Sequence, residues 1–208
     1  MSNVAAVVLA AGRSSRFRAA GGLEETKLVV ELDGKPIIRR VVEAALASVA
    51  RPIVVVTGHA REAVEQALSG LPVTIAFNPD YALGLSTSLR AGLAAVPPEA
   101  HGVVVLLGDM PKVDVRLIDA LILAFESRPR AVAAAPVYNR KRGNPVILGR
   151  ALFAQTVRLT GDVGARRLLA ALNDAQLVEI EAARSDAAFD VDTPNDLASA
   201  RELLDPGD

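Results

Sequence analysis

Short runs of apolar residues alternate with amphipathic segments along most of this chain. The apolar runs are near-continuous and rich in β-branched residues, a pattern typical of strands buried on both faces of a parallel sheet. We expect strands at residues 4–10, 52–57, 72–77, 102–108, 131–136 and 144–149. We expect helices near residues 36–49, 60–69, 86–95, 114–126, 149–157, 163–172 and 194–204.

The alternation of strands and helices predicts an α/β fold with three layers, in which helices cover both faces of a mostly parallel, twisted sheet. The sequence shows no internal repeat or linker, so we expect residues 1–208 to form a single domain. Ligands of such sheets bind in the crevice at the carboxyl ends of the strands. Candidate site residues are therefore expected in the segments that follow strands, at 11–16, 57–59, 78–88, 108–111 and 142–144.

Composition excludes several classes of function. The formal net charge is −1 and aromatic residues make up 3% of the chain, which argues against binding to nucleic acid or to an anionic membrane. The chain has no cysteine and two histidines, which excludes disulfides, thiolate metal sites and centres of several histidines. No signal peptide is visible and no apolar run is long enough to cross a bilayer, so we expect a cytoplasmic protein.

The first loop has the chemistry of a phosphate site. After the strand at 4–10, Gly12 permits a tight turn whose backbone N–H groups approach a ligand, and Ser14 adds a hydroxyl donor. The planar guanidinium of Arg16 matches phosphate oxygens, and Lys27 adds a second positive charge. The fingerprints of dinucleotide-binding and P-loop proteins are absent. On the loop alone, an ordinary strand–helix turn with solvated arginines is an equally good interpretation.

Three carboxylates follow predicted strands or extended segments. Asp109 comes directly after the strand at 102–108, where one carboxylate together with substrate phosphates suits Mg²⁺, although a turn or helix cap is the alternative. Asp190 and Asp192 are two residues apart, so an extended backbone places both on one face. Asp192 or Thr193, next to a proline, also fits the N-cap of a helix, and both interpretations hold together.

The segment at 78–93 offers small polar groups to a nucleoside. Gly84 would let the backbone approach the edge of a base, and Ser86 and Ser88 would donate hydrogen bonds to base, ribose or phosphate. Ser86 also fits the N-cap of the helix that follows. Thr57, at the end of another strand, is expected to border the same pocket.

The string L-A-A-G-x-S-x-R, from Leu9 to Arg16, resembles the signature loop of the MobA-like nucleotidyltransferases, specifically of their molybdenum cofactor cytidylyltransferase branch. Further segments are similar to motifs of that family: NPDYALGLSTSLRAGL, LGDMP, RKRGNPVILG, GDVGARRLL and FDVDTPNDL. The chain departs from the pattern at Arg18, which replaces a glycine, at Asn144, which replaces a histidine, and before Lys27, which follows a six-residue insertion. Lys35 is the next candidate for the role of that lysine.

The resemblance implies a Rossmann-like nucleotidyltransferase fold and a set of site residues. It implies that the first loop wraps the triphosphate of an NTP and that Mg²⁺ is held by Asp109 and Asp192, with Asp190 as the alternative to Asp192. The implied catalytic residues are Arg16, Lys27 and Asp109. The implied nucleotide-binding residues are Leu9, Ala10, Ala11, Gly12, Ser14, Arg16, Lys27, Thr57, Gly84, Ser86, Ser88 and Asp109.

The resemblance also implies an acceptor side that binds an anionic pterin phosphate. The acceptor-binding residues would be Arg142, Gly143, Asn144 and Arg166, with Arg167 as a further positive charge. Structural alternatives are a hairpin glycine at position 143 and a helix N-cap at Asp162.

The implied reaction moves CMP from CTP onto the phosphate of molybdopterin or of the molybdenum cofactor and releases pyrophosphate. Two alternatives stay open. One is nucleotidyl transfer from another NTP such as GTP, or to another phosphate acceptor such as a sugar phosphate. The other is a non-catalytic chaperone that binds the cofactor. A molybdoenzyme or its maturation chaperone is the expected protein partner.

Overall fold

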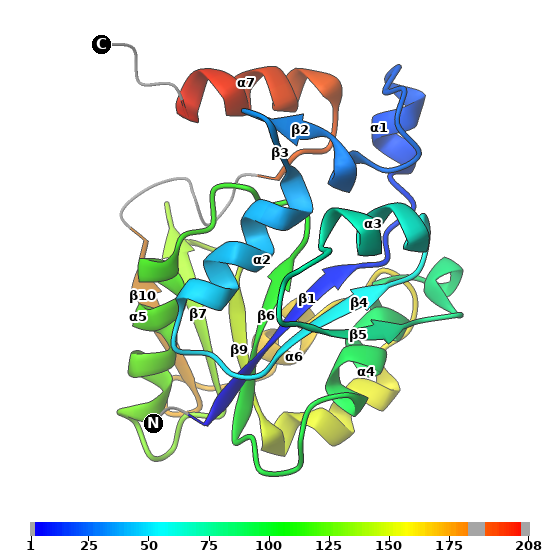
Figure 1. The fold of residues 1–208 in the computed structure, drawn as a ribbon. Helices are drawn as coiled ribbons and strands as arrows, with labels where there is room; N and C mark the ends of the chain where they lie inside the picture. The colour runs from blue at the N-terminus through cyan, green and yellow to red at the C-terminus, as the bar shows by residue number, and fades with distance from the viewer. Residues whose placement is uncertain (1–2, 183–189, 205–208) are drawn as a thin grey trace.

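A computed structural model describes residues 3–182 and 190–204 of the chain (Figure 1). In chain order the elements are β1 (Val4–Ala10), α1 (Ser15–Ala19), η1 (Lys27–Val29), β2 (Glu31–Leu32), β3 (Lys35–Pro36), α2 (Ile37–Ala47), β4 (Ile53–Thr57), α3 (Arg61–Ala67), β5 (Thr74–Phe77), η2 (Tyr81–Leu83), α4 (Leu85–Ala94), β6 (Gly102–Leu107), α5 (Val115–Glu126), β7 (Ala133–Tyr138), β8 (Lys141–Arg142), β9 (Val146–Gly149), η3 (Arg150–Arg158), α6 (Arg166–Ala170), β10 (Leu177–Glu181) and α7 (Pro194–Leu204). The η elements are 3₁₀ helices.

The main sheet is mostly parallel, with the strand order β10-β7-β9-β6-β1-β4-β5 and β8 paired to β7. β1 lies between β4 and β6 and is parallel to both, while β9 runs antiparallel to β6 and β7. The α/β fold and the mostly parallel sheet expected from the sequence are therefore confirmed. The antiparallel β9 makes the sheet mixed.

Helices cover both faces of this sheet, as expected. Alternate residues of β1 point to opposite faces, so Val8 packs with α2, α3 and α5 whereas Val7 packs with α4, η3 and α6. β1 is buried along its whole length, and the first loop follows directly from its carboxyl end.

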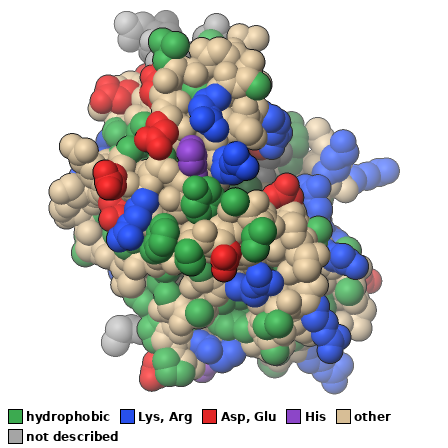
Figure 2. Space-filling model, turned by 90° about the vertical axis from the view of Figure 1, so that its right-hand side faces the viewer, with side chains coloured by type: hydrophobic (Ala, Val, Ile, Leu, Met, Phe, Trp, Pro, Cys, Tyr) green, Lys and Arg blue, Asp and Glu red, His purple; other side chains and the backbone are tan. Residues whose placement is uncertain are grey.

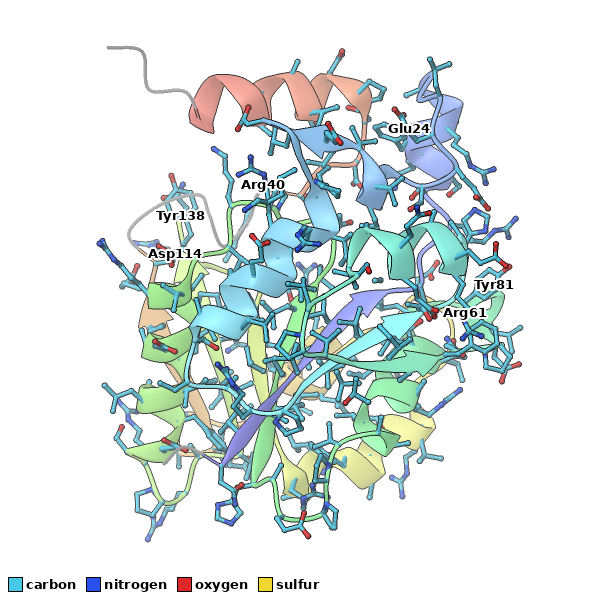
Figure 3. The ribbon with its side chains drawn as sticks, viewed as in Figure 1. Glu24, Arg40, Arg61, Tyr81, Asp114 and Tyr138 are labelled. Atoms are coloured by element: carbon cyan, nitrogen blue, oxygen red, sulfur yellow. The ribbon has the colours of Figure 1, made fainter. Side chains whose placement is uncertain are left out.

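A third, smaller apolar cluster lies beyond the carboxyl ends of the central strands. It buries Phe17 of α1, Leu32 of β2, Leu197 of α7, and Val191, which precedes α7. Figure 1 shows α7 beside β2, above the sheet. Arg40 of α2 reinforces the arrangement, since its guanidinium donates hydrogen bonds to the carbonyl oxygen of Leu32 (Figure 3). This cluster joins segments from both ends of the chain next to the first loop.

Acidic and basic side chains are interspersed on the face shown in Figure 2. None of the helices within residues 3–182 and 190–204 combines the length and the apolar character needed to cross a membrane.

Candidate active site

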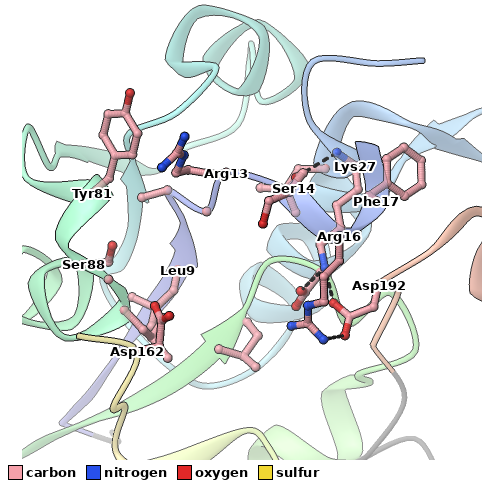
Figure 4. Close-up of a pocket in the computed structure, with 18 of the residues that line it drawn as sticks. Leu9, Arg13, Ser14, Arg16, Phe17, Lys27, Tyr81, Ser88, Asp162 and Asp192 are labelled. Carbon is pink, nitrogen blue, oxygen red and sulfur yellow. Dashed lines mark hydrogen bonds and ion pairs between the residues drawn. The ribbon is translucent and has the colours of Figure 1, made fainter. Parts of the chain in front are cut away.

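A cavity of about 550 Å³ opens at the carboxyl ends of β1 and β6 (Figure 4). It is lined by Leu9, Ala11, Gly12, Arg13, Ser14, Ser15, Arg16, Phe17, Lys27, Leu28, Tyr81, Ala82, Gly84, Leu85, Ser88, Leu107, Asp109, Asp162, Asp190 and Asp192. Most of the residues predicted to bind the nucleotide or a metal therefore lie together. We call this space the first cavity.

The first loop is held in shape by Ser14. Ser14 has φ 50°, in the left-handed region, so Ser14 makes the turn that the sequence predicts at Gly12. Its hydroxyl lies 3.0 Å from the Thr26 hydroxyl and accepts a hydrogen bond from the backbone N–H of Lys27 at 3.1 Å. A Cβ added at Gly12 would meet nothing within 4 Å. The missing side chain of Gly12 thus leaves space in the cavity, and Ser14 fastens the loop to the segment before Lys27.

The ammonium group of Lys27 lies between two carboxylates. Its Nζ is 2.7 Å from Oδ2 of Asp109 and 2.9 Å from Oδ1 of Asp192, and the Arg16 guanidinium forms an ion pair with the other oxygen of Asp192 (Figure 4). Burial alone would lower the pKa of Lys27, but the carboxylates of Asp109 and Asp192 raise it above its ordinary value. Lys27 is therefore a buried cation, held charged by its two partners.

The insertion before Lys27 does not displace this lysine from the cavity. The extra residues lie between the end of α1 at Ala19 and the start of η1 at Lys27, and Gly21 in this segment has φ 92°. Lys35, the alternative lysine, lies outside the cavity lining and forms an ion pair with Glu43 of α2. The structure thus brings Lys27 rather than Lys35 to the first loop.

The two carboxylates meet because a backbone hydrogen bond joins their segments. The N–H of Val191 donates to the carbonyl oxygen of Asp109 at 3.0 Å, and the Val191 side chain is buried in the third apolar cluster. Asp190 and Asp192, on either side of Val191, both line the cavity as the spacing predicted. Desolvation, and then the charges of Asp192 and Asp109, raise the pKa of Asp190.

Asp192 is also fixed by the start of α7. The Asp196 carboxylate accepts hydrogen bonds from the N–H groups of Asp192 and Thr193, at 3.1 and 2.7 Å, and the Thr193 hydroxyl accepts from the N–H of Asp196. This is a capping box, so Thr193 is the N-cap of α7. Thr193 therefore caps α7 while its neighbour Asp192 lines the cavity, so both interpretations of this segment hold.

The donor set fits a hard divalent cation that completes its coordination with substrate oxygens. Asp109 and Asp192 direct carboxylate oxygens at one point, which in this structure is the position of the Lys27 ammonium. Within the described residues, no group of three or more acidic or histidine side chains is arranged to hold a metal by itself. Mg²⁺ is commonly bound by one or two carboxylates together with substrate phosphates.

Three predicted nucleotide-binding residues do not line the first cavity. Ala10 is buried within β1, and the Thr57 hydroxyl donates to Glu65 of α3. Ser86 is buried in the first turn of α4, whose N-cap is Gly84, so Ser86 is not the N-cap. All three residues are buried and absent from the surface of the first cavity.

Gly84 and Ser88 line the cavity, but the close approach at Gly84 is to protein backbone. Gly84 has φ 104°, and a Cβ there would lie 2.3 Å from the carbonyl carbon of Gly161. The Ser88 hydroxyl accepts a hydrogen bond from the Asn78 side chain at 3.0 Å. Tyr81 and Arg13 also line this end of the cavity. Both lie inside motifs named above, at positions to which the sequence assigned no role.

A second cavity of about 1010 Å³ adjoins the first. It contains all four predicted acceptor residues, Arg142, Gly143, Asn144 and Arg166. Arg167 does not line it and is exposed. The residues shared with the first cavity are Leu9, Leu85, Leu107, Asp162 and Asp190. The two cavities thus meet beside the carboxylates.

The charge of the second cavity is more balanced than the sequence suggested. Its cationic residues are Arg140, Lys141, Arg142 and Arg166, and its acidic residues are Asp162, Glu179, Glu181 and Asp190. Arg142 forms an ion pair with Glu179 of β10. Glu179 and Glu181 lie on β10, a strand that the sequence pattern does not predict.

Both structural alternatives for this region are wrong in detail. The turn between β7 and β8 is made by Asn139 and Arg140, with φ 49° and 62°, so Gly143 follows the hairpin rather than forming its turn. The N-cap of α6 is Ala165, so Asp162 does not cap this helix.

The mostly parallel sheet, the open loop after β1 and the paired carboxylates of Asp109 and Asp192 belong to a nucleotidyltransferase, as the comparisons with known proteins show. More particularly, the chain belongs to the MobA-like NTP transferase family, because the model of the MobA-like NTP transferase domain matches residues 6–177.

Individual relatives agree with this assignment. The chain is 30% identical to the molybdenum cofactor cytidylyltransferase of Escherichia coli (strain K12) over 207 residues, which cover 97% of each protein. Its structure is similar to that of a nucleotidyl transferase from Methanothermobacter, with TM-score 0.82, 28% identity and 97% of each chain covered. It is also similar to the crystal structure of the Rv0371c protein of Mycobacterium tuberculosis in complex with manganese. There the TM-score is 0.79 and the identity 26%, with 96% of this chain and 98% of that chain covered.

Proposed function

We propose that this enzyme transfers CMP from CTP to the phosphate of a molybdopterin-type acceptor and depends on Mg²⁺. The observation that supports it best is the meeting of Asp109, Asp192 and Lys27 beside the first loop, where the two cavities join. The similarity over nearly full length to the Escherichia coli cytidylyltransferase favours this nucleotide and this acceptor. We also propose that residues 1–208 act as one domain.

The residues of the first cavity would bind and orient the triphosphate. The space above Gly12 would receive phosphoryl oxygens, the neighbouring N–H groups would donate hydrogen bonds to them, and Arg16 and Lys27 would offset their charge. Asp109 and Asp192 would hold Mg²⁺. When bound, this ion withdraws charge from the phosphates and favours their displacement.

The reaction would need no general base from the protein. An oxygen of the acceptor phosphate, already ionised at neutral pH, forms a bond to the α-phosphorus of CTP, and the bond between the α-phosphorus and the bridging oxygen to the β-phosphate breaks. Pyrophosphate leaves with both electrons of that bond. Neither histidine of the chain lines the two cavities, which agrees with a mechanism based on positioning and charge.

The test is a panel of CTP, GTP, ATP and UTP, each with Mg²⁺ and with or without molybdopterin, with pyrophosphate release as the readout. We expect release with CTP and molybdopterin together. Release with GTP but with none of the other three nucleotides would overturn the proposal. Absence of release with all four nucleotides would also overturn it, and would favour a binding protein that hands the cofactor on.

Asp109→Ala is the first variant to measure in this assay. We expect it to reduce turnover by at least roughly 100-fold, because it removes one of two aligned charges at the reacting phosphates. Its circular dichroism spectrum should match that of the unmodified protein, because Asp109 is in a loop and its carbonyl oxygen still accepts the bond from Val191. Near-normal turnover with Mg²⁺ would contradict the assignment of the metal site.

A further inference from the structure

The Lys27 ammonium occupies the point at which the proposed metal ligands converge. It contacts one oxygen of Asp109 and one of Asp192, and its side chain is mostly buried. Arg16 also contacts Asp192, but its side chain is 76% exposed, so it lies at the rim. Lys27 is thus the cation that faces both carboxylates from inside the cavity.

The lysine and a metal ion cannot hold the same two oxygens at once. Mg²⁺ binds carboxylate oxygens at about 2.0–2.1 Å. An ammonium nitrogen 2.7 and 2.9 Å from those oxygens fills the space between them and adds a like charge to the site. A metal ion that binds there must therefore displace the Lys27 ammonium, and the displaced ammonium needs another anionic partner.

The attachment of Lys27 to the first loop provides such a partner. The backbone of Lys27 is fixed by Ser14, a residue of the loop proposed to bind phosphate. The flexible stem can therefore turn the ammonium from the carboxylates to a phosphate on that loop without moving the backbone.

We propose that Lys27 is an internal counter-ion, which occupies the cation site in the nucleotide-free protein and leaves it for a phosphate of the incoming nucleotide when the metal ion binds. This inference rests on the proposed function, because it takes Asp109 and Asp192 as the metal ligands. It implies that the free protein binds the metal ion weakly, since Lys27 competes for the site, and that nucleotide relieves this competition.

The test measures metal binding without nucleotide, acceptor or turnover. Mn²⁺, which has an electron paramagnetic resonance signal when free, is titrated into the unmodified protein and into Lys27→Met, which keeps an unbranched apolar stem and removes the charged end of the side chain. We expect Lys27→Met to bind Mn²⁺ at least about tenfold more tightly. Lys35→Met makes the same change in net charge at the ion pair with Glu43, outside the cavity, and should bind Mn²⁺ like the unmodified protein.

A second measurement covers the risk that Lys27→Met folds poorly, because it leaves two carboxylates facing each other. We expect Lys27→Met to unfold at a lower temperature than the unmodified protein without metal, and Mn²⁺ to raise its unfolding temperature by more. Equal or weaker Mn²⁺ binding by Lys27→Met, or an equal gain in Lys35→Met, would overturn the counter-ion role.

Asp109→Asn separates this inference from the proposed metal site. If the double variant Lys27→Met with Asp109→Asn loses the tight binding, the gain arises at the proposed ligands. If the double variant still binds Mn²⁺ tightly, the metal lies elsewhere, and both the counter-ion role and the proposed ligand pair are wrong. If the single Asp109→Asn variant loses Mn²⁺ binding while Lys27→Met gains none, only the counter-ion role fails.

Discussion

Two glycines of the first cavity show how differently the same residue type can act. At Gly84 the backbone conformation and the contact with Gly161 both require glycine. At Gly12 neither does, because φ is not in the left-handed region and the space above the Cα is open. The requirement at Gly12 would therefore come from a ligand, whereas the requirement at Gly84 comes from the fold.

Gly12→Val should separate ligand binding from stability. Its side chain would extend into the space proposed for phosphoryl oxygens and meet no protein atom near its Cβ, so we expect an unchanged unfolding temperature. We expect CTP binding, measured by calorimetry with Mg²⁺, to weaken at least about tenfold, a loss of roughly 1.4 kcal/mol.

Gly84→Ala is the matched comparison. The added methyl group collides with backbone at a positive φ, so we expect a loss of roughly 1–3 kcal/mol in the free energy of unfolding. If Gly12→Val is destabilised as much as Gly84→Ala, or if it binds CTP normally, the space above Gly12 is not the phosphate site.

At the scale of elements, the sequence predicted the strands and helices that have a strong local pattern. It missed a strand that forms only by pairing with another strand. β1 matches its expected bounds, because a buried central strand is a continuous apolar run. β10 was missed because its alternating sequence, LVEIE, is short and half polar, and it becomes a strand by pairing with β7. The segment expected as a helix at 149–157 is the 3₁₀ helix η3, since apolar spacing alone does not separate the two helix types.

The same division applies to the candidate site. Segments with a motif, such as the first loop and the residues around Asp109 and Asp192, were found by resemblance and lie together in one cavity. Their mutual geometry was not predictable, because the contacts that Lys27 makes with Asp109 and Asp192 span 82 and 165 residues of chain. Glu179, in turn, reaches the second cavity through the pairing of β10 with β7.

The first turn of α7 links the stability of that helix to the position of Asp192. Asp196→Ala removes the carboxylate that accepts hydrogen bonds from the backbone of Asp192 and Thr193. We expect it to cost about 1 kcal/mol in the free energy of unfolding, as is typical for a lost cap, and also to lower turnover because Asp192 is no longer fixed. Denaturant unfolding and the pyrophosphate assay measure the two effects.

A second helix cap provides the control. Asp114 caps α5 by accepting a hydrogen bond from the N–H of Leu117 at 2.9 Å, and it lines neither cavity. We expect Asp114→Ala to lose similar stability and to keep its turnover. A rate loss of the same size in both variants would mean that reduced stability, rather than the position of Asp192, explains the effect of Asp196→Ala.

At the scale of the whole molecule, the two cavities are lined by largely different parts of the chain. The first is formed mainly by the first loop with α1 and by the segment 81–88, and the second by the β7–β8 hairpin, α6 and β10. They meet at Asp162 and Asp190, beside the proposed metal ligands. Two substrates bound in this way would present their phosphates to one another without sharing most of their contacts.

Two adjacent arginines of α6 test that division. Arg166 lines the second cavity, whereas Arg167 is exposed and lines neither cavity. We expect Arg166→Gln to raise the KM for molybdopterin about tenfold, because it removes a positive charge from the cavity proposed for an anionic acceptor, and to leave CTP binding unchanged.

Arg167→Gln changes the net charge by the same amount at the next residue and should leave both quantities unchanged. Since salt screens exposed charges over about 8–10 Å, the difference between the two variants should persist at 0.15 M salt. Equal effects of both variants would indicate general attraction of an anion by α6, and a rise in the Kd for CTP with Arg166→Gln would mean that the nucleotide extends into the second cavity. Either result would contradict the assignment of one substrate to each cavity.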